Sequence, residues 1–399
     1  MARRVLSLRG IAAVSTLPLL ILGCSSPATK SAPASSSPVS SASGASVAPL
    51  AGPLPVPAAP AAPVCGDPLT MSTRDKLAQL LMVGVRNAAD ARAVVSNYHV
   101  GGIFIGSWTD LSMLTDGSLP DIANAGPLPL AVSVDEEGGR VARLTSLIGA
   151  APSARVLAQT KTPDEVYQLA LDRGRQMRGL GITVDFAPVV DVTAAAADTV
   201  IGDRSFSNDP AVVTAYAGAY ARGLRDAGLL PVLKHFPGHG HGSGDSHTAG
   251  AVTTPPLADL QANDLIPYRT LAAEAPVAVM IGHLEVPGLT NGVPASLSPA
   301  AVGLLRSGNY GGPPFNGIVF TDDLSSMAAI SSHYGVAEAV LRALQAGADV
   351  GLWVTTDEVP AVLDRLESAV NGGELSLPAI DASVLRLAGL KGPSPRCGG

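Results

Sequence analysis

The stretch Lys234–His247, with the sequence KHFPGHGHGSGDSH, gathers side chains that are suited to proton transfer. Four histidines, a lysine and an aspartate fall within fourteen residues, and four glycines separate them. Glycines allow the backbone to turn tightly over a ligand. An aspartate next to a histidine orients the imidazole and raises its basicity. Asp245 and His247 are therefore a candidate acid–base pair on a catalytic loop.

Two other interpretations of this stretch stay open. Clustered histidines bind zinc, but the usual protease motif places them four residues apart on a helix, and glycine and proline oppose a helix here. A solvated loop without a function is the other alternative. We expect no metal site and no organic cofactor.

Polar residues recur where apolar runs end. Asp135 and Asp191 follow two such runs, Lys234–His235 ends a third, and His283 and Asp322 follow two more. In a parallel barrel the carboxyl ends of the strands meet at one face, where active sites lie. Helix caps would account for single aspartates but not for the lysine and the histidines.

Eight short apolar runs alternate with helix-like segments and predict a single (β/α)₈ TIM-type barrel. An open doubly wound sheet is the runner-up, although no dinucleotide-binding glycine motif follows the first run. The predicted strands are 81–85, 102–105, 130–134, 183–188, 232–235, 277–282, 318–321 and 349–354. The predicted helices are 88–97, 163–179, 210–227, 257–275, 298–306 and 335–345, with further helices within 357–390.

Composition and charge exclude one class of protein. The 399 residues are 47% hydrophobic and 15% charged, with a net charge of −7. Removal of the first 23 residues deletes three arginines and no acid, which lowers the charge to −10. Nucleic-acid binding requires an excess of lysine and arginine, so no nucleic-acid partner is expected.

The amino terminus has the pattern of an export signal. Arg3, Arg4 and Arg9 precede the apolar run 11–22, which ends in ILGC and resembles a bacterial lipobox. We expect a signal peptide at 1–23, a lipid on Cys24 and anchoring to the outer face of the cytoplasmic membrane. An ordinary secretory signal is the alternative. Residues 24–66, rich in serine, alanine and proline, are predicted to form a disordered tether before a folded domain at 67–399.

Two cysteines, Cys65 and Cys397, bracket the predicted domain. Export would place them in an oxidising compartment, and the first and last strands of a closed barrel are neighbours. We hypothesise that they form a disulfide, which in the chain-entropy model would contribute on the order of 5 kcal/mol.

Five motifs together resemble glycoside hydrolase family 3, in its bacterial β-N-acetylglucosaminidase branch. The likeness spans roughly residues 70–390, with the motifs in the expected order. They are VDEEGGRVARL at 134–144, FAPVVDV at 186–192, IGDRSF at 201–206, KHFPGHG with DSH at 234–247, and GIVFTDDLSSM at 317–327. The last motif has an extra serine, and the loop before Asp245 is richer in glycine than is usual.

The resemblance implies removal of terminal β-linked N-acetylglucosamine with retention of configuration. Asp322 matches the family nucleophile, and Asp245 and His247 match the acid–base pair. Five further residues match positions that hold the sugar, and they are Asp135, Arg143, Arg204, Lys234 and His235. Retention requires a carboxylate that attacks the anomeric carbon and a second group that gives and then takes a proton.

Several neighbouring polar residues have plainer interpretations. Asp323 is expected to be a backbone or helix-entry partner, and Glu136 and Glu137 are read as possible surface acids without a chemical role. Asp191 is expected to brace Lys234, with sugar binding as the alternative. Because Arg140 and Arg143 lie three residues apart, one of them is expected to be structural. His239 and His241 are read as loop groups, and His283 has no assigned role.

The expected function is hydrolysis of muropeptides or cell-wall fragments by a monomeric lipoprotein. Two alternatives keep the same site. In the first, phosphate replaces water as the acceptor, because a histidine acid–base leaves less negative charge near the incoming group. In the second, the protein binds amino sugars without turning them over.

Overall fold

The computed structural model describes residues 65–392 and residue 397. The predicted signal peptide, Cys24 and nearly all of the predicted tether lie outside these residues. Within the described part of the chain, no helix combines the length and the apolar character that are needed to cross a bilayer.

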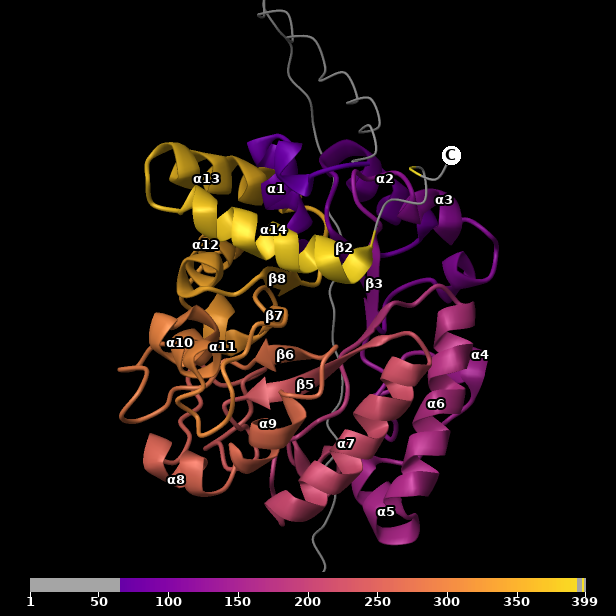
Figure 1. Ribbon diagram of the computed structural model, residues 1–399, viewed down its shortest axis with the longest axis vertical. Helices are drawn as coiled ribbons and strands as arrows, with labels where there is room; N and C mark the ends of the chain where they lie inside the picture. The colour runs from indigo at the N-terminus through magenta and orange to yellow at the C-terminus, as the bar shows by residue number, and fades with distance from the viewer. Residues whose placement is uncertain (1–64, 393–396, 398–399) are drawn as a thin grey trace, which may run out of the picture. The chain divides into compact units, whose positions relative to one another are not determined.

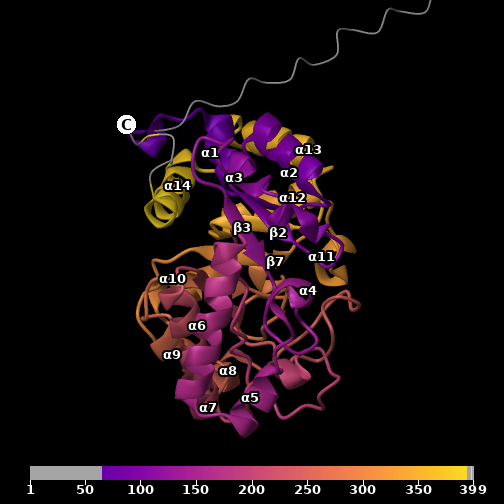
Figure 2. The ribbon, with the colours of Figure 1, turned by 90° about the vertical axis from the view of Figure 1, so that its right-hand side faces the viewer.

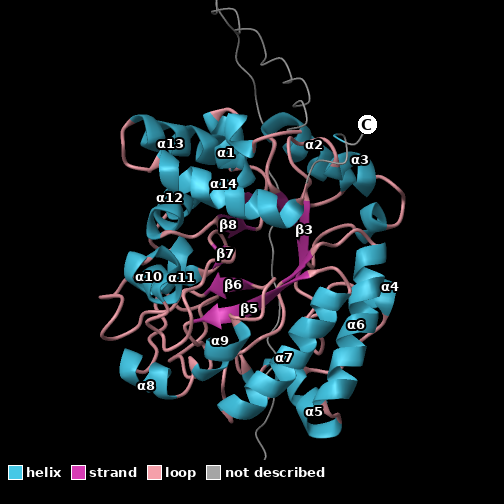
Figure 3. Cartoon of the chain, in the orientation of Figure 1, coloured by secondary structure: helices cyan, strands magenta, loops and turns pink. Residues whose placement is uncertain are grey.

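Eight parallel strands form a closed barrel, and each pairs with the next in the chain (Figure 1, Figure 3). Closure is made by β1 and β8, where Leu81 pairs with Gly351 and Val83 with Trp353. This confirms the predicted (β/α)₈ barrel and excludes the open sheet. The strands are β1 (Leu81–Gly84), β2 (Gly102–Ile105), β3 (Ala131–Val134), β4 (Val184–Asp185), β5 (Leu230–Phe236), β6 (Ala278–Ile281), β7 (Val319–Asp323) and β8 (Val350–Trp353).

The strands are apolar along their length because helices cover one face and the barrel interior covers the other. Every residue of β1, β2, β5, β6 and β8 is buried. Inside, the ring of Phe186 lies 5.8 Å from that of Phe104 and 5.4 Å from that of Phe320, measured between centroids. The interior is thus filled by side chains, and a ligand must bind at an end of the barrel.

The helices surround the barrel, and α6 and α7 lie side by side on one flank (Figure 1, Figure 2). The longer ones are α1 (Thr73–Gln79), α2 (Ala88–Tyr98), α5 (Ala154–Thr160), α6 (Pro163–Gly179), α7 (Pro210–Asp226), α10 (Pro299–Ser307), α12 (Val336–Ala346), α13 (Val359–Asn371) and α14 (Leu377–Lys391). The shorter ones are α3 (Leu119–Ala123), α4 (Thr145–Ile148), α8 (Leu257–Ala262), α9 (Ile266–Leu271) and α11 (Ala328–Ser331), with 3₁₀ turns η1 (Pro68–Thr70), η2 (Leu111–Leu114), η3 (Gly202–Arg204) and η4 (Ala295–Leu297).

Side chains cap the first turns of α6 and α7. Thr162 and Glu165 form a reciprocal capping box at α6, and the Asp209 carboxylate accepts from the amide of Ala211 at α7. Ser298 stands at the start of α10 but makes no side-chain cap there. The predicted helix at 257–275 is also divided, into α8 and α9.

The last helix, α14, does not simply complete the outer ring. Its carboxyl end reaches the amino ends of the first strands, where Lys391 Nζ donates to the carbonyl of Gly101 at 2.6 Å and to Gln79 Oε1 at 3.1 Å. A disulfide joins Cys65 to Cys397 just beyond it, with the two Cα atoms 5.1 Å apart. The structure therefore contains the disulfide that we hypothesised.

Candidate active site

A cavity of about 340 Å³ opens at the carboxyl ends of the strands. All eight residues predicted to act on or hold a sugar line it. A second cavity, of about 300 Å³, lies at the amino ends of the strands and contains none of the eight. The eight residues that share the first cavity are Asp135, Arg143, Arg204, Lys234, His235, Asp245, His247 and Asp322.

Asp322 lies near the end of β7 and faces this cavity. One of its oxygens accepts from the backbone amide of Asp323 at 2.9 Å. Burial opposes ionisation, but the charges of His235 and His283 outweigh it and lower the pKa of Asp322 to about 2. The carboxylate is therefore ionised in neutral solution.

Asp323 points into its own loop. Its carboxylate accepts from the backbone amides of Ser325 at 2.8 Å and Ser326 at 3.1 Å, and from both serine hydroxyls. The loop after β7 is held by these bonds. The expectation that Asp323 is a backbone partner is confirmed.

Asp245 and His247 lie on the loop that follows β5. Asp245 Oδ1 lies 2.6 Å from His247 Nδ1 and accepts from the His247 amide at 2.9 Å. The side chains are 41% and 57% exposed. Burial opposes ionisation of Asp245, but its bonds to His247 lower its pKa. The carboxylate thus fixes the imidazole through Nδ1, and Nε2 has no partner among the described residues.

This loop is held by contacts before the Asp245–His247 pair and at the pair itself. The carbonyls of Ser246 and His247 accept from the amides of Ala329 and Ala328, at 3.2 Å each, at the start of α11. At Gly240 the loop backbone packs so closely on Val192 that a Cβ there would lie 2.1 Å from the Val192 carbonyl oxygen. The glycine-rich sequence therefore permits a tight approach that a larger residue would prevent.

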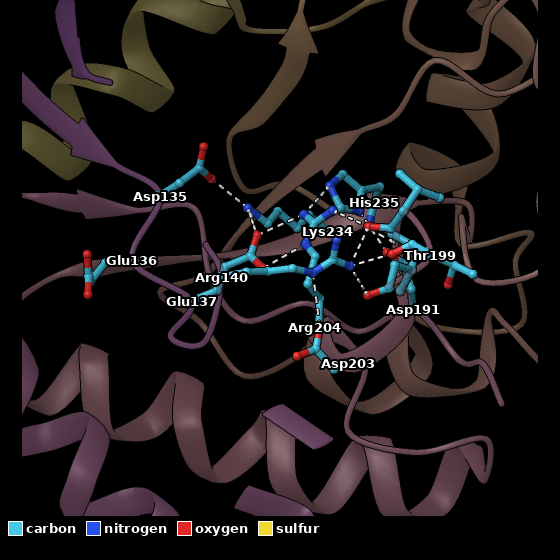
Figure 4. Close-up of polar contacts among 12 residues, drawn as sticks. Asp135, Glu136, Glu137, Arg140, Asp191, Thr199, Asp203, Arg204, Lys234 and His235 are labelled. Atoms are coloured by element: carbon cyan, nitrogen blue, oxygen red, sulfur yellow. Dashed lines mark hydrogen bonds and ion pairs between the residues drawn. The ribbon is translucent and has the colours of Figure 1, made fainter. Parts of the chain in front are cut away.

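A buried ion network forms the floor beside Asp322, and Figure 4 shows its contacts. Lys234 Nζ lies 2.6 Å from Asp135 Oδ1 and 2.5 Å from Glu137 Oε1. Arg204 binds the same carboxylate of Glu137 through Nε and Nη2, at 2.8 Å each. Burial opposes ionisation of Glu137, but Arg204 and Lys234 lower its pKa well below the usual range.

The interpretation of Glu136 and Glu137 as surface acids is wrong, since both are buried. Glu136 accepts from the amides of Arg143 and Leu144 at 2.7 and 2.8 Å and pairs with Arg173 at 2.6 Å. It therefore shapes the loop after β3, while Glu137 holds the two cations of the floor. Asp135 was selected because it directly follows a buried strand. Glu136 and Glu137 continue the same acidic run, so the same argument could have identified them as residues of the site.

Arg140 and Arg143 behave differently, as their spacing suggested. The guanidinium of Arg140 bonds to Asp203 at 3.0 Å and to the carbonyls of Val200 and Ile201 at 3.2 and 3.1 Å. The guanidinium of Arg143 lines the cavity and has no partner among the described residues. Arg143 is therefore available to a ligand.

Asp191 braces a different residue from the one expected. It is fully buried, and its carboxylate lies 2.7 Å from His235 Nδ1 and accepts from the amide of His239 at 2.7 Å. The expected brace to Lys234 is wrong, because that role belongs to Asp135 and Glu137. Through His235, Asp191 sets the ring that faces the cavity and stands 3.4 Å from Arg204 Nη2.

Three further histidines, His239, His241 and His283, do not line the cavity and have partners of their own. His239 Nε2 is 3.2 Å from the hydroxyl of Ser246, and His241 Nδ1 is 2.9 Å from Asp264. His283 Nε2 donates to the carbonyl of Asp323 at 2.7 Å. Among the described residues, no group of three or more histidines, cysteines and acids is arranged to hold a metal ion.

Comparison with known proteins gives matches over the whole folded region. Residues 72–390 match the N-terminal domain of glycosyl hydrolase family 3. A beta-hexosaminidase, LpqI, from Mycobacterium tuberculosis is 66% identical over 393 residues, which cover 98% of this chain and 99% of the relative.

Solved structures agree with these matches. A family member from Mycobacterium smegmatis has a TM-score of 0.82 at 74% identity, covering 82% of this chain and 100% of the other. A β-N-acetylglucosaminidase of the same family from Paenibacillus has a TM-score of 0.75 at 35% identity, covering 81% and 62%. The protein described here belongs to glycosyl hydrolase family 3.

Proposed function

We propose that the protein is a retaining exo-β-N-acetylglucosaminidase that removes terminal N-acetylglucosamine from muropeptides or cell-wall fragments. The observation that carries this proposal is the shared cavity, in which the ionised Asp322 and the Asp245–His247 pair face the same space. The relatives that are named beta-hexosaminidase and β-N-acetylglucosaminidase support the substrate class.

In the first step, an oxygen of Asp322 attacks the anomeric carbon, and the bond to the leaving oxygen breaks. Protonated His247 gives its Nε2 proton to that oxygen as the electron pair arrives. In the second step, neutral His247 takes a proton from water, the water oxygen attacks the same carbon, and Asp322 is released. Two displacements at one carbon retain the configuration.

The five residues predicted to bind the sugar also line the cavity and would hold the terminal sugar. Asp135 accepts hydroxyl hydrogen bonds, while Lys234, Arg204 and Arg143 donate them, and charged partners make such bonds strong. His235 is fixed by Asp191 and can bond to the same ring. We propose no cofactor in this mechanism.

The nucleophile is tested by comparing wild type with Asp322→Ala on 4-nitrophenyl N-acetyl-β-glucosaminide. Loss of about 10³-fold or more in kcat is expected, because the other carboxylates that line the cavity are engaged by Lys234, Arg204, His247 or the serines of their own loop. Added azide should restore turnover and give the α-glycosyl azide. Undiminished hydrolysis by Asp322→Ala would overturn the assignment, and Asp172→Ala on the exposed face of α6 is the control.

Water is proposed as the acceptor, in keeping with the relatives that are named hexosaminidases. Products formed with and without phosphate test this point. Free N-acetylglucosamine under both conditions is expected, whereas accumulation of the sugar 1-phosphate would identify a phosphorylase.

Export and lipid anchoring through Cys24 are also proposed, on the strength of the amino-terminal sequence. Expressed in its host, the protein should partition into detergent and carry a diacylglyceryl group on Cys24. Cys24→Ser should move it to the aqueous phase, and an unchanged distribution would contradict the anchor.

A further inference from the structure

Trp108 is an aromatic side chain on the wall of the cavity to which the catalytic steps assign no role. It follows β2, lies against the cavity, and is 45% exposed. Few large apolar side chains in the described chain are as exposed. A large exposed aromatic ring beside a polar site is a feature of ligand binding.

The backbone of Trp108 is held in a fixed turn. The amide of Thr109 donates to the carbonyl of Gly106 at 3.2 Å, and the Thr109 hydroxyl accepts from the Gly106 amide at 3.0 Å. The same hydroxyl donates to the carbonyl of Val85 at the end of β1, at 2.6 Å. The turn is therefore tied by its own hydrogen bonds to the ends of two barrel strands.

The indole ring is also fixed. It lies over Gly106, where a Cβ atom would come within 2.3–2.5 Å of three indole carbons. On one side it meets the ring of the buried Phe104, with the centroids 5.9 Å apart and the planes tilted by 59°. Only glycine leaves room for the indole at this place. The ring is thus supported by backbone and by Phe104, and part of it remains open to solvent.

The depth of the lining residues separates two parts of the cavity. The ion network is buried, with Lys234 2% exposed, whereas the indole of Trp108 is nearly half exposed. A terminal sugar that is bound by the network would occupy the deep part. The residue on the other side of the scissile bond must then extend toward the rim, where Trp108 and the half-buried side chain of Val200 lie.

We propose that Trp108 is a stacking platform for the leaving group, and that the leaving group at this position is a pyranose. The axial C–H groups of a β-linked pyranose form an apolar face that packs on an indole. Such packing is worth about tenfold in binding. This inference rests on the proposed function. It specifies the chemical class of the leaving group that the rim of the cavity accepts.

The test compares two substrates that differ only beyond the anomeric carbon. N,N′-diacetylchitobiose places a pyranose in the leaving-group position, and N-acetyl-β-glucosaminyl fluoride places a single atom there. Trp108→Ala should lower kcat/KM about tenfold for the disaccharide and less than about twofold for the fluoride. Trp108→Phe should recover part of the loss. Leu385→Ala, which removes an exposed apolar side chain from α14, is the control.

Three outcomes would overturn the inference. Equal losses of kcat/KM on both substrates would mean that Trp108 contacts the terminal sugar or has a structural role. No loss on either substrate would mean that Trp108 does not contribute to substrate binding. A loss confined to the fluoride would also contradict it. Failure of the wild type to turn over the fluoride would instead reject the proposed function, so the two failures are distinguishable.

A spectroscopic signal gives a second readout. The sequence has two tryptophans, and Trp353 is fully buried. In an Asp322→Ala background, binding of the disaccharide should change the emission of Trp108, while N-acetylglucosamine should not. The change should be absent when Trp108→Phe is added, and a change that persists would contradict the assignment.

Discussion

Glu137 links the two cations on the floor of the cavity through a single carboxylate. Arg204 donates two bonds to it and Lys234 Nζ lies 2.5 Å away, with all three side chains at most 10% exposed. Burial lowers the pKa of Lys234, but Asp135 and Glu137 more than offset that effect and raise it. The sugar binding that we propose for Lys234 and Arg204 would therefore depend on an acid that is not itself expected to touch the ligand.

Glu137→Gln should impair both stability and binding. It leaves two buried cations with less compensating charge, and the expected cost is about 3–5 kcal/mol in the free energy of unfolding. We also expect kcat/KM to fall roughly 100-fold, chiefly through KM, because the donors lose their fixed positions. Urea unfolding and steady-state kinetics measure the two effects.

The control for this variant is Glu374→Gln. Glu374 pairs with Arg365 at 2.8 Å, but the pair lies at the surface, where solvent screens it. For Glu374→Gln, neither the free energy of unfolding in urea nor the steady-state kinetics should change. If Glu137→Gln behaved like Glu374→Gln, the buried network would have no role in stability or binding.

Asp185 is expected to make the stability of the folded protein depend on pH. Its side chain is fully buried, one oxygen accepts from the Glu136 amide at 3.0 Å, and the other has no partner among the described residues. Burial, more than any neighbour, raises its pKa well above the usual value. The folded protein therefore retains a proton that the unfolded chain releases above about pH 4.

As the pH rises from about 4 toward the folded pKa of Asp185, the folded state loses stability relative to the unfolded state, by up to about 1.4 kcal/mol per pH unit. Asp185→Asn has no proton to lose. Its stability relative to wild type should therefore increase between pH 5 and pH 8 in urea unfolding. Asp172→Asn on the surface controls for general charge removal, and a pH-independent difference for Asp185→Asn would refute the protonated state.

At the scale of elements, the geometry of the candidate acid–base pair, Asp245 and His247, depends on how the loop after β5 packs. The loop is fastened to the start of α11 through two carbonyls, and Gly240 allows it to lie against Val192. The position of His247 relative to Asp322 is thus determined by contacts of its loop with two other segments.

Gly240→Ala should displace this loop. A Cβ at this position would lie 2.1 Å from the carbonyl oxygen of Val192. Because that oxygen belongs to the backbone, the clash cannot be relieved by the rotation of a side chain. We expect kcat to fall at least about tenfold, because misplacement of a proton donor by about 1 Å is costly. Gly244→Ala is a matched control in the same loop, since its nearest neighbour would be 4.0 Å away. Equal effects of the two substitutions would contradict this role of the close approach.

The elements were more predictable from the sequence than the contacts between them. Eight apolar runs located the strands to within a few residues, because a strand that is buried on both faces must be apolar throughout. The partners of Glu137 and Asp191 could not be predicted, since they lie 67 and 44 residues away in the chain. The break between α8 and α9 was also missed, although Pro267 in the first turn of α9 is a signal that could have marked it.

At the scale of the whole barrel, the candidate active site and the stabilising disulfide lie at opposite ends. The cavity with the candidate catalytic residues lies at the carboxyl ends of the strands, and α14 reaches the amino ends. The disulfide between Cys65 and Cys397 lies next to α14 and closes a sequence separation of 332 residues. The disulfide therefore ties together the two ends of the domain without contributing to the active site.

Replacement of both cysteines should separate stability from activity. In the chain-entropy model the cross-link restricts the unfolded chain, so Cys65→Ser with Cys397→Ser should lower the free energy of unfolding by up to about 5 kcal/mol. At 25 °C the kcat and KM of the double variant should match wild type, because the bridge follows α14, whose end lies at the amino ends of the strands, whereas the cavity opens at their carboxyl ends. Thermal melting and kinetics on 4-nitrophenyl N-acetyl-β-glucosaminide measure the two quantities, and thiol titration of the unfolded, unreduced wild type should find neither Cys65 nor Cys397. A loss of activity at temperatures where the variant remains folded would show that the amino end of the barrel influences the site at the other end.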